Sequence, residues 1–221
     1  MKKKVICIVC VLCVINVFAT RDRWDDYKVD WTPLMCAIYY NQTALRDSLI
    51  QAGVDVNEAS KWYKITALTV AIRKQDFCSV KALLETDRIT DIDGYLFTAC
   101  AYQDVNIVQL LIEHGAKPDS VWQHGHSPLM SAATYGSIEI VKLLLETKIN
   151  IDQQRTVDGL TALMLAVSKG HIDKVKLLLE HGADKNILDK NGESAYDSID
   201  YGIHRGFVSE EVAEELRILL K

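Results

Sequence analysis

The sequence predicts an all-α solenoid built from repeated pairs of short antiparallel helices, on three observations. A start position recurs at spacings of 34, 28, 33, 34 and 33 residues, at Thr32, Thr66, Gly94, Ser127, Thr161 and Ser194. Five residues later comes a small residue that lets helices approach closely, at Ala37, Ala71, Ala99, Ala132 and Ala166. Aliphatic pairs follow at Leu49-Ile50, Leu83-Leu84, Leu111-Ile112, Leu144-Leu145 and Leu178-Leu179. So short a unit cannot bury its own apolar face, so its copies must stack.

The clearest copy of the unit runs from Gly159 to Gly192. Thr161 can cap a first helix with its side-chain oxygen, and Gly170 ends that helix. A second helix then presents one apolar face through Val175 and residues 177–179. Gly182 stands where helices commonly stop in a left-handed residue. The stretch therefore predicts two helices joined by a tight turn.

This stretch resembles an ankyrin repeat, whose period is about 33 residues. The matching slots are Thr161-Ala162-Leu163, Ala166-Val167, Gly170-His171, Val175, Leu177-Leu178-Leu179 and Gly182-Ala183-Asp184-Lys185-Asn186. The resemblance extends from about Trp31 to the C-terminus. It implies an ankyrin solenoid with short β-turn fingers. It also implies binding of another protein on the concave face formed by the inner helices and the turns.

The expected organisation has four parts. Residues 1–19 form a signal peptide, 20–30 an N-terminal cap with Trp24 and Tyr27, 31–190 five repeats, and 191–221 a capping repeat. The repeats start near residues 32, 66, 94, 127 and 161. The second repeat has no glycine at its exit and the third starts early, so we expect an irregular joint between Ile89 and Asp93. The amphipathic helix expected over Ser209–Lys221 gives the last repeat the polar outer face that a cap requires.

The first residues have the pattern of a secretory signal peptide. Three lysines precede an apolar run over Val5–Phe18, and Val17-Phe18-Ala19 resembles a cleavage site. We therefore expect cleavage after Ala19 and a secreted or periplasmic protein; the short apolar run suggests a bacterial exporter, and a eukaryotic one stays open. An uncleaved anchor is the alternative, although the run is shorter than the ~20 residues of a spanning helix. Lipidation is disfavoured because no small residue precedes Cys7, Cys10 or Cys13.

Charge restricts the classes of partner. Removal of residues 1–19 takes away three lysines and no acid, so the formal charge changes from −5 to −8. The remaining chain has no long basic run, which disfavours nucleic acid and anionic membrane surfaces. We expect a monomer that does not insert into a membrane after cleavage and whose partner is another protein.

Few residues suggest chemistry. Cys36, Cys78 and Cys100 lie in different repeats and different slots, so we expect three thiols. His124 and His126 could form half of a metal site, which makes a periplasmic metal- or small-molecule-binding protein the alternative function. A solvated turn is the simpler interpretation. No catalytic constellation stands out, so we expect no enzymatic activity, cofactor or metal.

The candidate binding residues are those that stacking does not require. They are aromatic or basic side chains on the inner helices and turns, a composition typical of interfaces. They are Tyr39, Tyr40, Trp62, Tyr63, Arg73, Lys74, Tyr102, Trp122, Tyr135 and Lys169. Alternatively, the tyrosines cover the seams between helices. We expect Trp62 and Trp122 to lie outside the stacked core. An inhibitor or immunity protein, an envelope scaffold and a host-directed effector all fit an exported protein of this kind.

Overall fold

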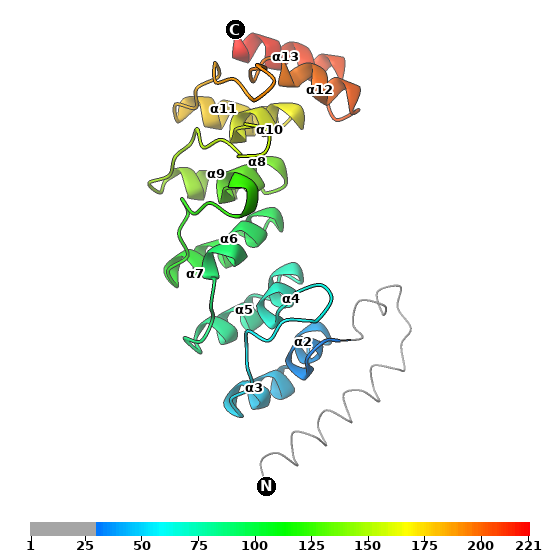
Figure 1. The fold of residues 1–221 in the computed structure, drawn as a ribbon, viewed down its shortest axis with the longest axis vertical. Coiled ribbons are helices and arrows are strands. Elements are labelled where there is room, and N and C mark those ends of the chain that lie inside the picture. The colour runs from blue at the N-terminus through cyan, green and yellow to red at the C-terminus, as the bar shows by residue number, and fades with distance from the viewer. Residues whose placement is uncertain (1–29) are drawn as a thin grey trace. The chain divides into compact units, whose positions relative to one another are not determined.

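The computed structural model describes residues 30–221, so the expected signal peptide and most of the expected N-terminal cap lie outside the described residues. These residues form twelve α-helices and no strand (Figure 1). The helices are α2 (Pro33–Tyr39), α3 (Thr43–Gln51), α4 (Ala67–Arg73), α5 (Phe77–Leu84), α6 (Ile92–Ala101), α7 (Val105–Glu113), α8 (Pro128–Thr134), α9 (Ile138–Leu145), α10 (Ala162–Ser168), α11 (Ile172–Glu180), α12 (Ser198–His204) and α13 (Glu210–Leu220). One 3₁₀ turn among residues 30–221, η2, covers Gln123–Gly125.

The chain divides into two compact units between Thr90 and Asp91. The division falls inside the segment 89–93, where the repeat spacing shortens. Unit 1 contains the helix pairs α2–α3 and α4–α5, which pack on each other. In unit 2 the inner helices α6, α8, α10 and α12 pack in that order, and α7, α9, α11 and α13 form a second layer beside them (Figure 1). Each unit is therefore a stack of helix pairs, as the repeats predict.

Four of the expected start residues cap an inner helix. The side-chain oxygens of Thr32, Thr66, Ser127 and Thr161 each accept a hydrogen bond from the backbone amide three residues later, at 3.2–3.3 Å. Such a cap contributes about 1 kcal/mol to stability. In the first, second, fourth and fifth repeats the inner helix thus begins directly after the start residue.

The third and last repeats start differently from the prediction. Gly94 lies inside α6, which begins at Ile92 after a left-handed Asp91 and has ten residues instead of seven. The chain before α6 is too short to form a projecting loop, and its last residues belong to the helix instead. In the last repeat Ser194 does not cap a helix, because its hydroxyl bonds the carboxylate of Asp197 at 2.7 Å. Helix α12 therefore begins later, at Ser198.

The core follows the two columns of residues that recur from repeat to repeat. All five alanines of the alanine column are at most 1% exposed. The first residue of each aliphatic pair is buried, at Leu49, Leu83, Leu111, Leu144 and Leu178. The second residue is buried only at Leu84 and is half-buried in the other four repeats. Of each aliphatic pair, the first leucine is therefore the consistent contributor to the core.

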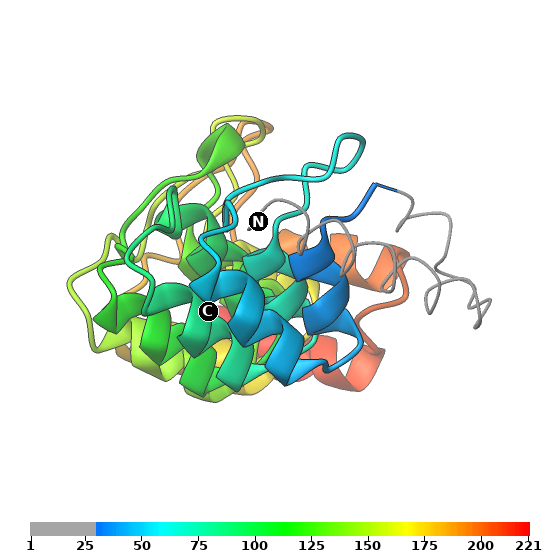
Figure 2. The same cartoon turned by 90° about the horizontal axis from the view of Figure 1, so that it is seen from below.

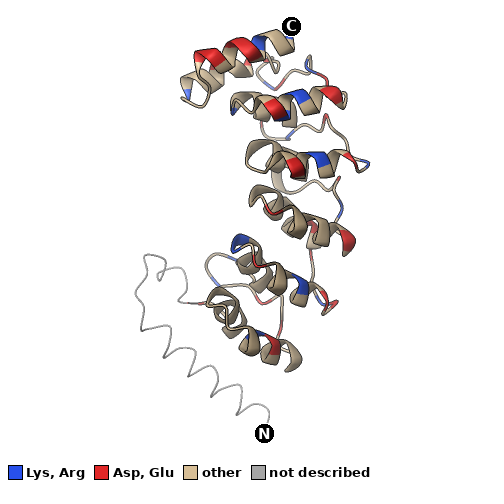
Figure 3. Ribbon diagram, turned by 180° about the vertical axis from the view of Figure 1, so that it is seen from behind, with Lys and Arg blue, Asp and Glu red and all other residues tan. Residues whose placement is uncertain are grey.

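The exposed side of the outer helices is charged. Figure 3 shows acidic and basic residues along α9, α11 and α13 of unit 2. Helix α13 buries Ala213, Leu216 and Leu220 and exposes its glutamates, so the end of the stack is polar, as a cap requires. Within residues 30–221, no helix combines the length and the hydropathy that crossing a bilayer would need.

Three finger-like loops precede α8, α10 and α12 in unit 2, and Figure 2 shows loops projecting from one side of the helices. Successive fingers are joined by backbone hydrogen bonds of 2.9 Å, from Thr156 to His124 and from Lys190 to Asp158. Gly125 and Gly159 lie at these crossings in left-handed conformations. A Cβ at either would lie 2.6 or 2.9 Å from the backbone nitrogen of the next finger. The two glycines therefore permit the fingers to pack edge to edge.

Candidate functional site

Unit 2 contains a groove of about 370 Å³ between its inner helices and its fingers. Residues of α6, α8, α10 and α12 line one side, and residues of the fingers line the other. Two of the candidate residues, Tyr135 and Lys169, lie on its wall, whereas Trp122 lies just outside it. Of the ten candidate residues, the groove therefore brings together Tyr135 and Lys169.

The floor of the groove carries three hydroxyl side chains. Ser131 donates to the carbonyl of Phe97 at 3.0 Å, Thr134 to that of Met130 at 2.7 Å, and Ser168 to that of Leu165 at 2.9 Å. All three residues are at most 9% exposed. Because every hydroxyl proton is already bonded to backbone, the floor leaves no unsatisfied donor when water is displaced. Small side chains here also create the hollow itself.

One end of the groove is closed by aromatic packing. The Trp122 indole stacks on the Phe97 ring, with centroids 5.0 Å and planes 25° apart, and the His126 ring meets Phe97 edge-on at 5.7 Å. Burial lowers the pKa of His126, and the positive charge of Arg155 lowers it further. Trp122 is still 40% exposed, so its ring covers Phe97 from outside the stacked core.

The other end holds a lysine among aromatic rings. The Lys169 ammonium lies 3.5 Å from the ring centroid of Phe207 and 6.0 Å from that of Tyr135. Tyr135 is 60% exposed and Phe207 50%. Lys169 forms no ion pair with any acid among residues 30–221. This end thus offers an unneutralised cation, held by cation–π contacts, beside accessible aromatic surface.

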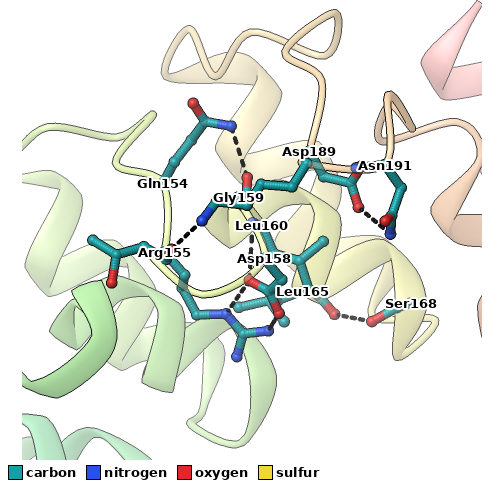
Figure 4. Close-up of polar contacts among 11 residues, drawn as sticks. Gln154, Arg155, Asp158, Gly159, Leu160, Leu165, Ser168, Asp189 and Asn191 are labelled. Atoms are coloured by element: carbon teal, nitrogen blue, oxygen red, sulfur yellow. Dashed lines mark hydrogen bonds and ion pairs between the residues drawn. The ribbon is translucent and has the colours of Figure 1, made fainter.

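A tightly bonded finger forms the opposite wall (Figure 4). The Arg155 guanidinium is turned toward Asp158, donating from Nε at 2.9 Å and also from Nη2. Burial tends to raise the pKa of Asp158, but the bonds from Arg155 and from the Leu160 amide outweigh burial and hold it below its ordinary value. Gln154 spans two fingers, donating to the carbonyls of Gly159 and Leu188. This wall is rigid, and its one arginine is neutralised.

In unit 1 several candidate residues support the structure. Lys74 donates to the carbonyls of Ile38 and Tyr39 and to the Asn41 side chain, so its charge lies at the C-terminal end of α2. Tyr39 meets Trp31 edge-on at 5.4 Å. Three of the candidate tyrosines are half-buried: Tyr39 and Tyr40 in unit 1, and Tyr102 in unit 2. Their burial favours the alternative in which these tyrosines cover helix seams.

The remaining candidate residues of unit 1 face solvent. Trp62 is 72% exposed and Tyr63 50% exposed, both on the loop that precedes α4. Arg73, in the last turn of α4, is also exposed. These side chains are available to a partner.

The residues considered for chemistry lie apart. Cys36, Cys78 and Cys100 are thiols, respectively half-buried, exposed and buried. His124 is exposed, with a left-handed backbone at a fingertip. Within the described part of the chain no group of three His, Cys, Asp or Glu side chains is placed to hold a metal ion.

Phe207 and Tyr201 line the groove but were not predicted from the sequence. A left-handed glycine follows the inner helix nine residues after Thr161, at Gly170, but twelve residues after Ser194, at Gly206. The last repeat is therefore shifted by three residues, which places Phe207 in the slot of His171. The Gly206-Phe207 pair is the signal from which this position could have been found.

Comparison with known proteins agrees with this architecture. The family model for ankyrin repeats (3 copies) matches residues 34–121 and 96–189. The chain belongs to the ankyrin-repeat family. Ankyrin repeats are in general non-catalytic protein-interaction modules, so the partner class of this chain is protein.

Relatives are found in animals and bacteria. The chain is 34% identical over 177 residues to the ankyrin repeat protein YahD of Escherichia coli, covering 74% of this chain and 84% of YahD. It is 44% identical over 126 residues to the ankyrin repeat and KH domain-containing protein mask-1 of Caenorhabditis elegans, covering 54% of this chain but 5% of mask-1. The mouse ankyrin repeat and SAM domain-containing protein 6 is 37% identical over 75 residues, 34% of this chain and 8% of that protein.

Proposed function

We propose that this chain binds a protein partner in the groove of unit 2, by rigid docking and without catalysis. The observation that carries the proposal is the end of the groove where Lys169 lies between the rings of Tyr135 and Phe207. Exposed aromatic surface around a cation is the composition of an interface hot spot. The bonded floor and the rigid finger wall also support preformed binding, because little ordering accompanies association.

The site of action is outside the cytoplasm. The Lys2-Lys3-Lys4 stretch and the Val17-Phe18-Ala19 site support export and cleavage. The match to YahD along most of its length supports a bacterial origin. An inhibitor or immunity protein, an envelope scaffold and a host-directed effector are the three roles consistent with such a protein.

Export has a direct test. Sequencing the N-terminus of the purified mature protein should give a chain that begins at Thr20. A full-length protein recovered mainly from the cytoplasm would contradict export, while leaving binding in the groove untouched.

Binding has a variant-based test. The full mature chain, a Tyr135→Ala/Lys169→Ala variant and a Gln109→Ala control would each capture proteins from the envelope fraction of the source organism. Gln109 is exposed on α7, in the outer layer. A specific partner should be retained by the parent and the control and lost by the double variant. Equal capture by all three proteins would remove the groove from the proposal.

A further inference from the structure

The finger of unit 1, residues Ser60–Ile65, differs from the fingers of unit 2 at its tip. Lys64 lies two residues before the start position of its repeat, Thr66. Gly125 and Gly159 lie two residues before the start positions of the fourth and fifth repeats. The backbone of Lys64 is also left-handed, with φ of 51°. At the two glycines a Cβ would meet the next finger, yet Lys64 carries a whole side chain. The finger of unit 1 is therefore built without another finger across its tip.

The repeat that follows this finger explains the difference. Only residues 85–91 connect α5 to α6, whereas residues 146–161 connect α9 to α10. The short connection leaves no finger before α6. The tip of Ser60–Ile65 thus lacks the covering that the first two fingers of unit 2 receive from the finger after them.

The finger is nevertheless held in one conformation. The Ser60 amide donates to the Ile65 carbonyl at 2.7 Å, and the Ile65 amide donates to Ser60 Oγ at 3.2 Å. Ser60 is 1% exposed. The Trp62 amide donates to the Asp30 carboxylate at 2.9 Å. A closed and anchored loop loses little conformational freedom when its tip is bound.

The tip combines apolar surface with positive charge. Trp62 has the largest exposed fraction, 72%, of the exposed large hydrophobic side chains within residues 30–221. The Lys61 ammonium lies 5.2 Å from its ring centroid. Neither Lys61 nor Lys64 forms an ion pair with an acid in the described part of the chain. Both charges are thus available to neutralise carboxylates on another molecule.

We propose that this finger is a second docking point, which inserts Trp62 into an apolar pocket with an acidic rim on a protein partner. Tryptophan is among the residues that most often dominate interfaces, and rim lysines give charge complementarity and faster association. An anionic bilayer is the less favoured occupant, because attraction to it grows with the number of basic residues. The tip has two basic residues, in a chain whose formal charge is −5. The inference concerns unit 1 and stands independently of the groove in unit 2.

A random dodecamer peptide library displayed on phage provides a defined probe for the full mature chain. Selection should enrich peptides in which a large apolar residue is flanked by Asp or Glu. Binding of the synthesised consensus peptide, measured by fluorescence anisotropy, should weaken at least about thirtyfold for Trp62→Ala. Binding should also weaken for Lys61→Glu/Lys64→Glu and fall as salt is raised. Ile218→Ala, 64% exposed on α13, is the matched control and should bind as the parent does, while Tyr135→Ala tests separately whether the peptide uses the groove.

Three results would overturn the inference. The first is a consensus without acidic residues, or one whose binding is insensitive to Trp62→Ala. The second is Trp62-dependent binding to vesicles containing phosphatidylserine, with no Trp62-dependent peptide, which would assign the tip to a lipid surface. The third is a dimer that Trp62→Ala dissociates, which would assign it to a second copy of the chain. Loss of binding in Tyr135→Ala alone would instead place the peptide in the groove.

Discussion

The ammonium of Lys174, on α11, lies 3.1 Å from the carbonyl oxygen of Ala132 and 3.2 Å from that of Ala133, at the C-terminal end of α8. The lysine thus bonds carbonyls in the last turn of α8, at the negative end of the helix dipole, where the Ala132 carbonyl also accepts from the Gly136 amide. Burial lowers the pKa of Lys174 to about 8. Lys74 makes the equivalent contact with α2 in unit 1. In both units, therefore, a lysine of the following repeat caps the C-terminal end of an inner helix.

The buried lysine gives unit 2 a pH dependence of defined sign. The folded pKa lies below the ordinary 10.5, so between about pH 8 and 10.5 the unfolded chain binds more protons than the folded chain. The free energy of unfolding should therefore rise with pH across this window, relative to a Lys174→Met variant. Urea unfolding of both proteins at several pH values measures it. A pH-independent difference between them would show that Lys174 titrates normally.

The stacking of Trp122 on Phe97 predicts a role in stability. Trp122→Ala removes an aromatic contact together with partly buried surface, so we expect a loss of about 1–2 kcal/mol in the free energy of unfolding. Trp62→Ala is the matched control and should change stability by no more than about 0.5 kcal/mol, because Trp62 is 72% exposed. Chemical denaturation measures both. Equal effects would show that the Trp122 stack contributes nothing.

The crossing of the fingers can be tested with two glycines. Gly159 and Gly192 are both left-handed, with φ of 82° and 81°. A Cβ at Gly159 would lie 2.9 Å from the Lys190 nitrogen, whereas a Cβ at Gly192 meets nothing within 4 Å. Replacement by alanine should cost each site about 1–2 kcal/mol of backbone strain, and Gly159→Ala should cost further stability. Identical melting temperatures for the two variants would count against the crossing.

The alanine column predicts intolerance of larger residues. Ala132 is fully buried, so Ala132→Leu should overpack the junction between neighbouring repeats and destabilise the protein by about 1–3 kcal/mol. Ala44 is exposed on α3 and provides the control, since Ala44→Leu adds the same atoms at the surface. Thermal unfolding compares the two variants. A leucine at position 132 that melts with the parent would mean that this column does not lie between helices.

Local spacing was sufficient to predict the parts of the fold that each repeat determines alone. Thr161 caps α10 by accepting from a backbone amide only three residues later in the same repeat. Ala166 is buried because every repeat needs a small residue at that position. The last repeat has an irregular register, so its α12 begins at Ser198 and Phe207 was missed. A single insertion of three residues is enough to hide a groove residue from a periodic alignment.

Contacts between repeats explain the rest of the differences at the site. The position of Trp122 in a turn predicts an exposed side chain, but its environment also depends on Phe97, which belongs to the preceding repeat. The sequence predicts Lys74 to be a cation on the surface, but its ammonium donates to carbonyls of α2. Tyr135 and Lys169 were predicted on the binding face and do line the groove, because few neighbours cover the side chains at the ends of α8 and α10.

Site-specific photo-crosslinking in the source organism tests most directly whether a partner protein occupies the groove of unit 2. Benzoylphenylalanine would replace Tyr135, at the wall of the groove, or Gln109, exposed on the outer helix α7, in the full-length protein. After irradiation, mass spectrometry identifies the attached protein. Binding in the groove predicts one specific crosslinked protein from position 135 and none of it from position 109. Crosslinking of the partner from position 109 alone would contradict the proposal and move the binding surface to the outer helices.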